Sequence, residues 1–277
     1  MKKRTRLILN SILLVIMLFG STKFILSRLE NYRSQQDYDQ AMEIAAGQPT
    51  EEMTRQETIP ETTMVSEEPE EIPAEIPDDP VLQELLAIDL AALREENEDV
   101  IGWISIPGTK INYPLLQWTD NDFYLKHTWK QSENASGAIF MECQNAPDFS
   151  EFNTIIYGHN MINGTMFGSL HHYRNSSYWE KHPFVYIVND EGVLRFDVFA
   201  VLSANTKSII YGLGIETDQR KTEFLRFAQD YSFVETGLTP TVDDRILTLS
   251  TCTGAGHVNR WVVLSILNEE HSCKRPT

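Results

Sequence analysis

The sequence predicts a mainly β fold, an eight-stranded barrel, from three observations. The 197 residues from Val81 to Thr277 are enough for one hydrophobic core. Short apolar runs rich in β-branched and aromatic residues recur along them, and Gly, Pro and Asn separate the runs. Eight such runs at this density favour a closed or nearly closed barrel. The predicted strands are Ile101 to Ile106, Ile111 to Gln117, Ala138 to Gln144, Thr154 to Gly158, Phe184 to Asn189, Val193 to Ser203, Ile246 to Cys252, and Trp261 to Leu267.

Helices are predicted in three places around these strands. Leucines recur at helical spacing between Val81 and Asn97, which indicates an amphipathic N-terminal helix packed on the domain. Two helical insertions are expected, at Met166 to His172 and at Asp218 to Tyr231. The second lies between the sixth and seventh strands.

The first 26 residues have the composition of a membrane anchor. Four basic residues precede the apolar run Leu7 to Phe19, which extends to Leu26 across Lys23 and approaches the ~20 residues that cross a bilayer. No Ala-x-Ala cleavage site follows. The pattern favours an uncleaved anchor over a cleaved signal peptide, with the N-terminus in the cytoplasm. We therefore expect a single-pass cell-membrane protein whose C-terminal domain is extracellular.

Residues 27–80 are expected to contain a polar helix followed by a linker. Ser27 to Ala46 is polar, is rich in helix formers and would continue the helix above the membrane. Gln48 to Pro80 holds eleven acidic residues, one basic residue and six prolines, so it cannot bury enough apolar surface to fold. Its composition is typical of an extended, solvated spacer between a membrane and a domain. The domain itself is expected at 81–277.

The charge balance disfavours one class of partner. The formal net charge is −17, of which Gln48 to Pro80 and the region from Val81 onward contribute −10 each. No basic stripe occurs in the predicted domain. Nucleic acid is therefore not an expected partner, because phosphate contacts need clustered Lys and Arg.

Cys252 is the first candidate catalytic residue. It ends the strand that begins at Arg245, Gly254 and Gly256 then indicate a turn, and Arg260 opens the next strand. A thiol attacks as thiolate, and at its ordinary pKa of roughly 8.5 only a small fraction is ionised at neutral pH. A neighbouring guanidinium and an imidazole are the usual means of activation.

His159 is the second candidate. It follows an apolar strand and a glycine in the stretch NTIIYGHN, so it too lies at the end of a buried strand. Two strand ends far apart in sequence meet when both strands belong to one barrel. A cysteine, a distant histidine and a third polar group are the expected components of a thiol nucleophile site.

The remaining cysteines and histidines have less specific explanations. Cys143 and Cys273 could pair in an extracellular chain, although two unrelated thiols explain them better. His257 lies in the turn between Cys252 and Arg260 and could approach the site. No ligand spacing typical of zinc occurs, and no motif requires a cofactor. The other histidines are interpreted as surface or structural groups: His127, His171, His172, His182 and His271.

At these residues the sequence resembles the class B sortases. The resemblance is carried by TLSTC followed by RWVV, by IIYGHN about ninety residues upstream, and by three longer blocks in the same order. It covers roughly Leu85 to Leu267. The blocks are VIGWISIPGTKINYPLLQWTDNDFYLKHTW, GAIFMECQN and NTIIYGHNMINGTMFGSL.

The resemblance implies a cysteine transpeptidase with the sortase-type barrel. Cys252 would attack a threonine carbonyl in a C-terminal sorting signal of a secreted protein and form a thioester, which an amine of a peptidoglycan precursor would resolve. His159 would transfer protons to and from the amines. Arg260 would donate hydrogen bonds to the oxyanion or to the substrate carbonyl. The resemblance also implies a substrate groove lined partly by the insertion between strands six and seven.

Three further residues match positions where class B enzymes contact the sorting peptide. They are Asn121, Leu125 and Ser250. One departure is visible, because only seven residues separate Cys252 from Arg260. A loop this short puts the preference for the second substrate in doubt.

Other interpretations remain open. A secreted cysteine peptidase would use the same residues and resolve the thioester with water. A pilin-polymerising sortase would use an amine of another protein subunit. A wall-tethered binding module would need no nucleophile. That interpretation leaves the presence of Cys252, His159 and Arg260 unexplained.

Overall fold

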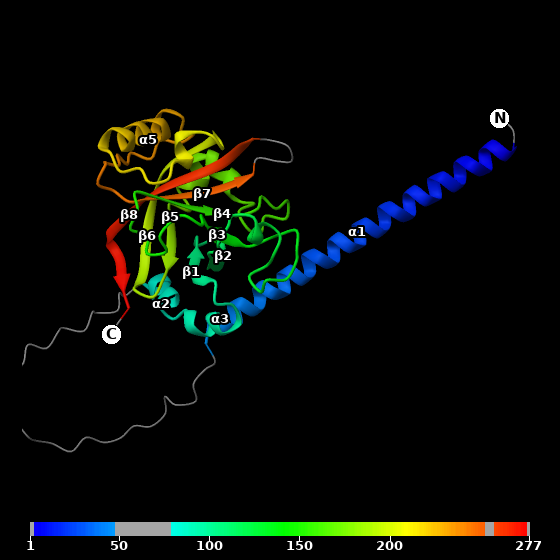
Figure 1. The fold of residues 1–277 in the computed structure, drawn as a ribbon, viewed down its shortest axis with the longest axis horizontal. Coiled ribbons are helices and arrows are strands. Elements are labelled where there is room, and N and C mark those ends of the chain that lie inside the picture. Colours follow the sequence, from blue (N-terminus) through cyan, green and yellow to red (C-terminus); the bar gives the residue numbers. More distant parts are fainter. Residues whose placement is uncertain (1–2, 48–78, 253–257, 276–277) are drawn as a thin grey trace, which may run out of the picture.

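A closed eight-stranded barrel forms the centre of the molecule, as the sequence predicts. The computed structural model describes residues 3–47, 79–252 and 258–275, and for Cys252 it describes the backbone. The strand order around the barrel is β1-β2-β3-β4-β7-β8-β6-β5. Neighbouring strands are antiparallel except for the parallel pairs β2/β3 and β4/β7 (Figure 1). The strands are β1 (Val100–Ser105), β2 (Asn112–Leu116), β3 (Ile139–Met141), β4 (Asn153–Tyr157), β5 (Phe184–Val188), β6 (Gly192–Asn205), β7 (Ile246–Cys252) and β8 (Asn259–Lys274).

The apolar residues of these strands fill two clusters. One fills the barrel and includes the fully buried Trp103 and Phe140. The other lies outside the sheet, where α5 (Asp218–Asp230) packs Phe224 and Leu225 against the outer residues of β6 and β8. The helix predicted between the sixth and seventh strands is therefore present, and Thr217 caps its first turn.

The helix predicted from Val81 to Asn97 is two helices. α2 (Pro80–Leu86) and α3 (Leu90–Glu96) are separated by a turn. Asp89 breaks the run, because its carboxylate accepts a hydrogen bond from the Ala92 amide at 2.9 Å and caps α3. The leucine periodicity holds within each helix and buries Leu85 and Leu93, so it did not reveal the break.

The insertion after β4 is also less helical than predicted. Met166 has a positive φ of 52°, and the helix that follows is a short 3₁₀ turn, η2 (Leu170–Arg174). A four-residue helix, α4 (Ser176–Trp179), comes next and was not predicted. The other short turns are η1 (Phe123–Leu125) and η3 (Ile209–Tyr211).

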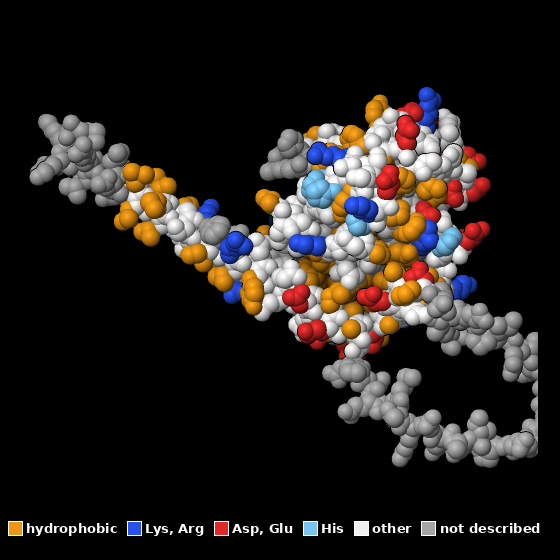
Figure 2. Space-filling model, turned by 180° about the vertical axis from the view of Figure 1, so that it is seen from behind, with side chains coloured by type: hydrophobic (Ala, Val, Ile, Leu, Met, Phe, Trp, Pro, Cys, Tyr) orange, Lys and Arg blue, Asp and Glu red, His pale blue; other side chains and the backbone are white. Residues whose placement is uncertain are grey.

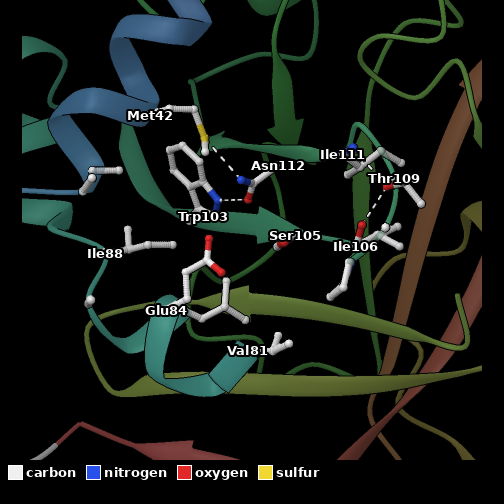
Figure 3. A pocket seen from close by; sticks show the side chains of 16 residues that line it. Met42, Val81, Glu84, Ile88, Trp103, Ser105, Ile106, Thr109, Ile111 and Asn112 are labelled. Carbon is white, nitrogen blue, oxygen red and sulfur yellow. Dashed lines mark hydrogen bonds between the residues drawn. The ribbon is translucent and has the colours of Figure 1, made fainter. Parts of the chain in front are cut away.

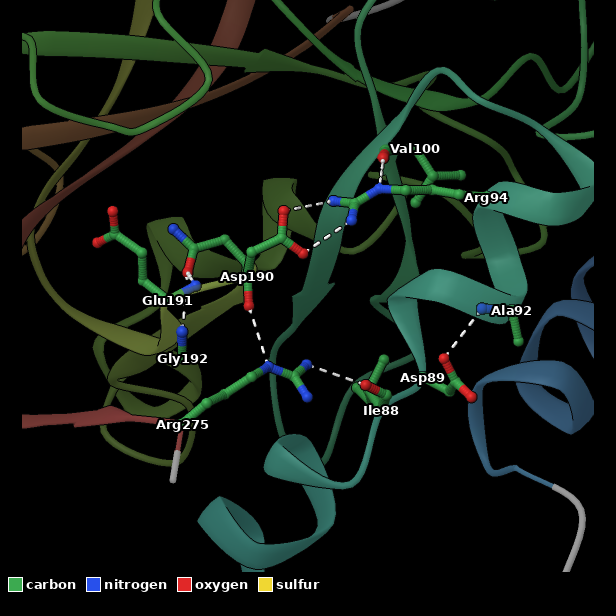
Figure 4. Close-up of polar contacts among 10 residues, drawn as sticks. Ile88, Asp89, Ala92, Arg94, Val100, Asp190, Glu191, Gly192 and Arg275 are labelled. Carbon is green, nitrogen blue, oxygen red and sulfur yellow. Dashed lines mark hydrogen bonds and ion pairs between the residues drawn. The ribbon is translucent and has the colours of Figure 1, made fainter. Parts of the chain in front are cut away.

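Arg275, directly after β8, forms hydrogen bonds that connect the segment of α2 and α3 to the barrel (Figure 4). The Arg275 guanidinium donates to the carbonyls of Leu86 and Ile88, at 3.2 and 2.9 Å, across the turn between the helices. Arg94 of α3 forms a two-bond ion pair with Asp190, which follows β5. Because Asp190 is mostly exposed, this ion pair contributes little to stability, and the backbone contacts of Arg275 matter more.

The long N-terminal helix α1 (Lys3–Ala45) extends away from the barrel and begins far from it (Figure 1). Its C-terminal end packs beside α3 and β2, where Tyr38, Ala41 and Ala45 are buried. The amide of Asp89 donates to the carbonyl of Ala45 at 2.9 Å. The helix thus joins the barrel before residues 48–78 begin. The expected division into anchor, linker and domain stays a prediction, and the end of α1 that precedes residues 48–78 already contacts the barrel.

A cavity of about 490 Å³ lies where α1, α2 and the first two strands meet (Figure 3). Met42, Ile88 and Trp103 form its apolar walls, and the carboxylate of Glu84 points into it. The Trp103 indole donates to the Asn112 side chain at 2.6 Å at its edge. None of the predicted catalytic residues whose side chains the structure describes lines this cavity.

Candidate active site

Three neighbouring strands bring the predicted catalytic positions to one edge of the barrel. In the β7/β8 pair the Cα of Cys252 lies opposite that of Arg260. In the parallel β4/β7 pair Tyr157 lies opposite Ser250, and the Gly158 amide donates to the Ser250 carbonyl at 3.2 Å. Continuing that register by two residues brings position 159 level with position 252. His159 comes two residues after the end of β4, so we infer from this register that residues 159, 252 and 260 lie close to one another at the same edge of the barrel.

A pocket of about 360 Å³ opens at this edge. His159, which follows β4, lines it together with Ser250 and Thr251 of β7 and Arg260 of β8. In the barrel, β7 lies between β4 and β8. Two other predicted residues, Asn121 and Leu125, also line it. The structure thus places every predicted site residue whose side chain it describes around one pocket, and the backbone of Cys252 follows directly after Thr251.

Close packing fixes His159. A Cβ at the preceding Gly158 would lie 2.5 Å from Ile139 Cδ1 and 2.8 Å from the Phe167 ring, so only glycine fits there. The carbonyl of His159 accepts a hydrogen bond from the Phe167 amide at 3.0 Å. In the ring, Nε2 lies 2.7 Å from the Leu125 carbonyl oxygen. Since a carbonyl only accepts, Nε2 carries the proton, and Nδ1 is the ring nitrogen that a catalytic role would use.

Comparison with known proteins decides the family. A family model of the sortase domain matches residues 104–267. The chain is 35% identical to sortase B of Staphylococcus aureus over 173 residues, which cover 62% of this chain and 71% of that protein. It is 37% identical to sortase B of Listeria monocytogenes over 171 residues, covering 59% and 67% respectively. The chain belongs to the sortase family.

Solved structures agree in fold. Sortase B from Bacillus anthracis in complex with AAEK1 superposes with a TM-score of 0.67 at 28% identity, covering 86% of this chain and 98% of that one. The Staphylococcus aureus sortase B–substrate complex gives a TM-score of 0.62 at 34% identity, covering 65% and 84%. The protein is a class B sortase, a cysteine transpeptidase that cleaves a peptide bond and transfers the acyl group. The predicted class and enzyme type are confirmed.

A buried carboxylate organises one wall of the sortase pocket. Glu142 accepts from the Asn121 side-chain amide, which lies 2.7 and 2.8 Å from its two oxygens, and from the Tyr157 hydroxyl at 2.9 Å. The Asn121 oxygen in turn accepts from the Cys143 amide at 2.9 Å. Burial, followed by the negative charge of Glu142, raises the pKa of Tyr157, so this phenol remains a donor at neutral pH. The Asn121 amide is held in place by protein partners.

A pair of hydroxyl groups forms a further polar contact in this pocket. The Tyr211 hydroxyl lies 2.8 Å from the Ser250 hydroxyl, and both residues line the pocket. Tyr211 comes from η3, between β6 and α5. The connection between strands six and seven therefore contributes to the pocket wall through Tyr211.

The other described histidines serve structural roles. His127 stacks on Phe123 with ring centroids 4.1 Å apart, and His182 Nδ1 bonds to the Pro107 carbonyl at 2.9 Å. His171 and His172 pack ring against ring, and burial followed by the charge of His171 lowers the pKa of His172. His271 bonds to Asn268. His257 lies outside the described residues.

The two described cysteine side chains are free thiols. Burial, followed by the neighbouring Glu142, raises the pKa of Cys143, which is the opposite of what a nucleophilic thiol needs. Cys273 lies on the last strand, beside a different cavity. Within the parts of the chain that the structure describes, no cluster of His, Cys, Asp and Glu has the geometry of a metal site.

Among the residues that sequence reasoning missed, Glu142, Tyr157 and Tyr211 make the hydrogen bonds described above. Glu142 left a signal, because a carboxylate inside the apolar run GAIFMEC must find buried donors. Tyr157 and Tyr211 left none, since an aromatic residue at a strand end or in a short loop is common in any β protein.

Proposed function

We propose that this sortase is a membrane-anchored extracellular enzyme that cleaves a C-terminal sorting signal through a thioester on Cys252. The acyl group is then transferred to an amine of the cell wall. The observation that supports the proposal is that His159 and Arg260 line one pocket together with Thr251, and that the backbone of Cys252 pairs with that of Arg260 beside it.

In the first half-reaction the Cys252 thiolate attacks the carbonyl carbon of the scissile peptide bond. The C–N bond breaks as the His159 imidazolium delivers its Nδ1 proton to the leaving amine, which leaves a thioester on the sulfur. The Leu125 carbonyl suits this step, because it accepts from Nε2 in both protonation states of the ring. Arg260 donates to the carbonyl oxygen as its negative charge develops.

In the second half-reaction an amine attacks the thioester carbonyl. His159 takes the proton from the attacking nitrogen at Nδ1, the C–S bond breaks, and Cys252 leaves as thiolate. A solved structure of sortase B complexed with triglycine supports a small glycyl amine as the type of acceptor. We assign the acceptor to a peptidoglycan precursor amine. The sorting peptide lies against Asn121, Leu125 and Ser250, which share the pocket with His159.

The N-terminal part of α1 is the proposed anchor. One helix of the described residues is long and apolar enough to cross a membrane, and its side chains at residues 12–20 are all exposed. Figure 2 shows apolar side chains along this outer part of the helix. Exposure of so many large apolar groups is unfavourable in water and favourable in lipid.

The test uses the full chain in detergent micelles with a library of sorting-type peptides, with and without triglycine. Mass spectrometry should detect an acyl-enzyme that is absent from Cys252→Ala and from His159→Ala. Cys143→Ala is the matched control, because it removes another thiol near the pocket and should keep the acyl-enzyme. A product joined to triglycine supports transfer, whereas a free carboxylate in its presence would indicate a peptidase. An acyl-enzyme that persists in Cys252→Ala would refute the assignment.

A further inference from the structure

We propose that the C-terminal part of α1 positions the imidazole of His159, with Tyr38 and Ser34 as positioning residues of the transpeptidase. The inference rests on the proposed function, since it requires His159 to take part in the reaction. It makes the helix that leaves the membrane a structural component of the active site.

The first link joins α1 to the segment 124–137, which we call the brace loop. The Tyr38 hydroxyl donates to the Gly137 carbonyl at 2.8 Å, and the Ser34 hydroxyl lies 2.6 Å from that of Ser136. Between these two residues of α1, the carbonyl of Asp37 accepts a hydrogen bond from the Trp129 indole at 2.6 Å. These contacts hold the C-terminal end and the middle of the brace loop, and the side chains that make them are largely buried.

The second link joins the brace loop to His159. The Leu125 carbonyl accepts the Nε2 proton of His159, and Leu125 belongs to the brace loop. Gly137 has φ +57°, and a Cβ there would lie 2.6 Å from the Tyr124 oxygen, 2.9 Å from the Leu125 oxygen and 3.0 Å from His159 Cδ2. The Gly137 backbone therefore packs against both the imidazole ring and the carbonyl that orients it.

Tyr38 thus reaches the imidazole through a single residue. Its hydroxyl holds the Gly137 carbonyl on one side, while the Gly137 backbone packs on the ring on the other. A displacement of Gly137 moves the surroundings of His159 directly. General acid–base catalysis depends steeply on such placement, because a catalytic group must stay within hydrogen-bond reach of the proton that it transfers.

The brace loop depends on α1 because several of its buried polar groups find their partners there. Ser136 is 3% exposed and Asn134 is 8% exposed. The Asn134 side chain donates to the Glu30 carbonyl at 3.0 Å, and Thr128 donates to Asp37 at 2.9 Å. Buried donors and acceptors left without partners cost about 1–3 kcal/mol each. A brace loop that loses α1 would rearrange to hydrate these groups, and the Leu125 carbonyl would move with it.

The test compares two conservative changes on the buried side of α1 with one on its exposed side, in the full chain in detergent micelles. The double variant S34A/Y38F removes two hydroxyls that contact the brace loop and keeps the Tyr38 ring. Tyr32→Phe is the matched control, because Tyr32 lies on the same helix and is 62% exposed. The substrates are the peptide selected by the library screen and triglycine.

We expect the acylation rate of S34A/Y38F at saturating peptide to fall about tenfold, while Tyr32→Phe keeps the parent rate. Nitrogen-15-edited NMR should show the Nε2 proton of His159 as a slowly exchanging signal in the parent and in Tyr32→Phe. In S34A/Y38F that signal should broaden through exchange with water. A purely stabilising role would lower the thermal midpoint and leave the rate and the signal of the folded protein unchanged.

Parent values for both the rate and the signal in S34A/Y38F would overturn the inference, as would an equal loss in Tyr32→Phe. Failure of the proposed function has a different signature. If Cys252→Ala or His159→Ala keeps the acyl-enzyme, the catalytic assignment fails whatever the result at Tyr38. If both lose it and S34A/Y38F acts like the parent, the inference alone fails.

Discussion

The two ends of α1 are one continuous helix with opposite surroundings. Residues 12–20 are apolar, and every one of them is exposed. Between residues 30 and 45 the helix is largely polar, yet it buries Ser34, Tyr38, Ala41 and Ala45 against the barrel. Hydropathy alone would therefore assign the contact surface to the wrong half of the helix.

The difference shows that two separate driving forces act on one helix. The outer half can gain free energy only from an apolar surrounding such as lipid. The inner half is fixed by small side chains that allow close approach, by one buried aromatic ring and by hydrogen bonds to the brace loop. No break in the helix separates the two halves. If the outer half is the anchor that we propose, α1 would position the barrel relative to the membrane.

The largest expected difference between the two halves is in the unfolding free energy that is lost when each half is removed by truncation. A chain that begins at Arg28 should keep the unfolding free energy of the parent barrel. A chain that begins at Val81 loses the buried Tyr38 ring and its hydrogen bonds, so it should be less stable by roughly 5 kcal/mol. Urea denaturation followed by tryptophan fluorescence measures both. Equal midpoints for the two truncated chains would mean that the inner half does not stabilise the barrel.

A charge in the outer half should weaken membrane insertion and leave the stability of the barrel unchanged. Leu14→Lys places an ammonium within the exposed apolar run and should disfavour membrane insertion by about 3 kcal/mol. The barrel should unfold at the same urea concentration as in the parent, because Leu14 contacts none of it. Alkaline extraction of membranes reports insertion, and Leu14→Ile is the matched control. A change in the barrel midpoint would show that the halves are energetically coupled.

The inner half should be sensitive to side-chain volume. Ala41 is fully buried, so Ala41→Leu forces extra methyl groups between α1 and the barrel and should cost about 1–3 kcal/mol. Ala46→Leu adds the same atoms at an exposed position of the same region and should change stability by less than about 0.5 kcal/mol. Thermal unfolding of both variants distinguishes tight packing from loose contact.

The sequence predicts the barrel well because each strand carries its own signal. Turn residues bound every apolar run, and the eight predicted segments match the eight observed strands. The positions of His159 and Cys252 at strand ends follow from the same pattern. That these ends lie side by side depends on the parallel β4/β7 pairing, which is a contact between distant segments.

The features that could not be predicted from the sequence are ones that leave only weak signals in the local sequence. The break at Asp89 is a cap inside an unbroken leucine period. The packing of Tyr38 on Gly137 joins residues 99 positions apart, and a tyrosine in a polar helix resembles any surface residue. Resemblance to class B sortases pointed to the proposed catalytic positions and to Asn121, and it gave no indication that Glu142 accepts hydrogen bonds from the Asn121 amide.

The smallest expected effect is a difference in how the two halves of α1 respond to alkaline pH. Near neutral pH we expect no difference. Burial raises the pKa of Tyr113 and of Tyr124, both in the region that the inner half contacts. A raised pKa in the folded state means that this stability is fully present below about pH 10, the ordinary value for tyrosine, and is lost as pH rises beyond it. The loss is at most about 1.4 kcal/mol per tyrosine for each pH unit. Residues 12–22 carry no titratable side chain, so the outer helix should stay intact.

Two signals recorded between pH 8 and pH 12 test this expectation. Fluorescence of the buried Trp103 and Trp129 reports the barrel, and retention of the chain in micelles reports the outer half. The barrel signal should begin to change only above about pH 10, while retention stays constant. Tyr124→Phe should reduce the slope of the barrel transition, since one ionising group is then absent. Loss of retention in step with the fluorescence change would mean that the outer half depends on the packed half, and the two driving forces would not be independent.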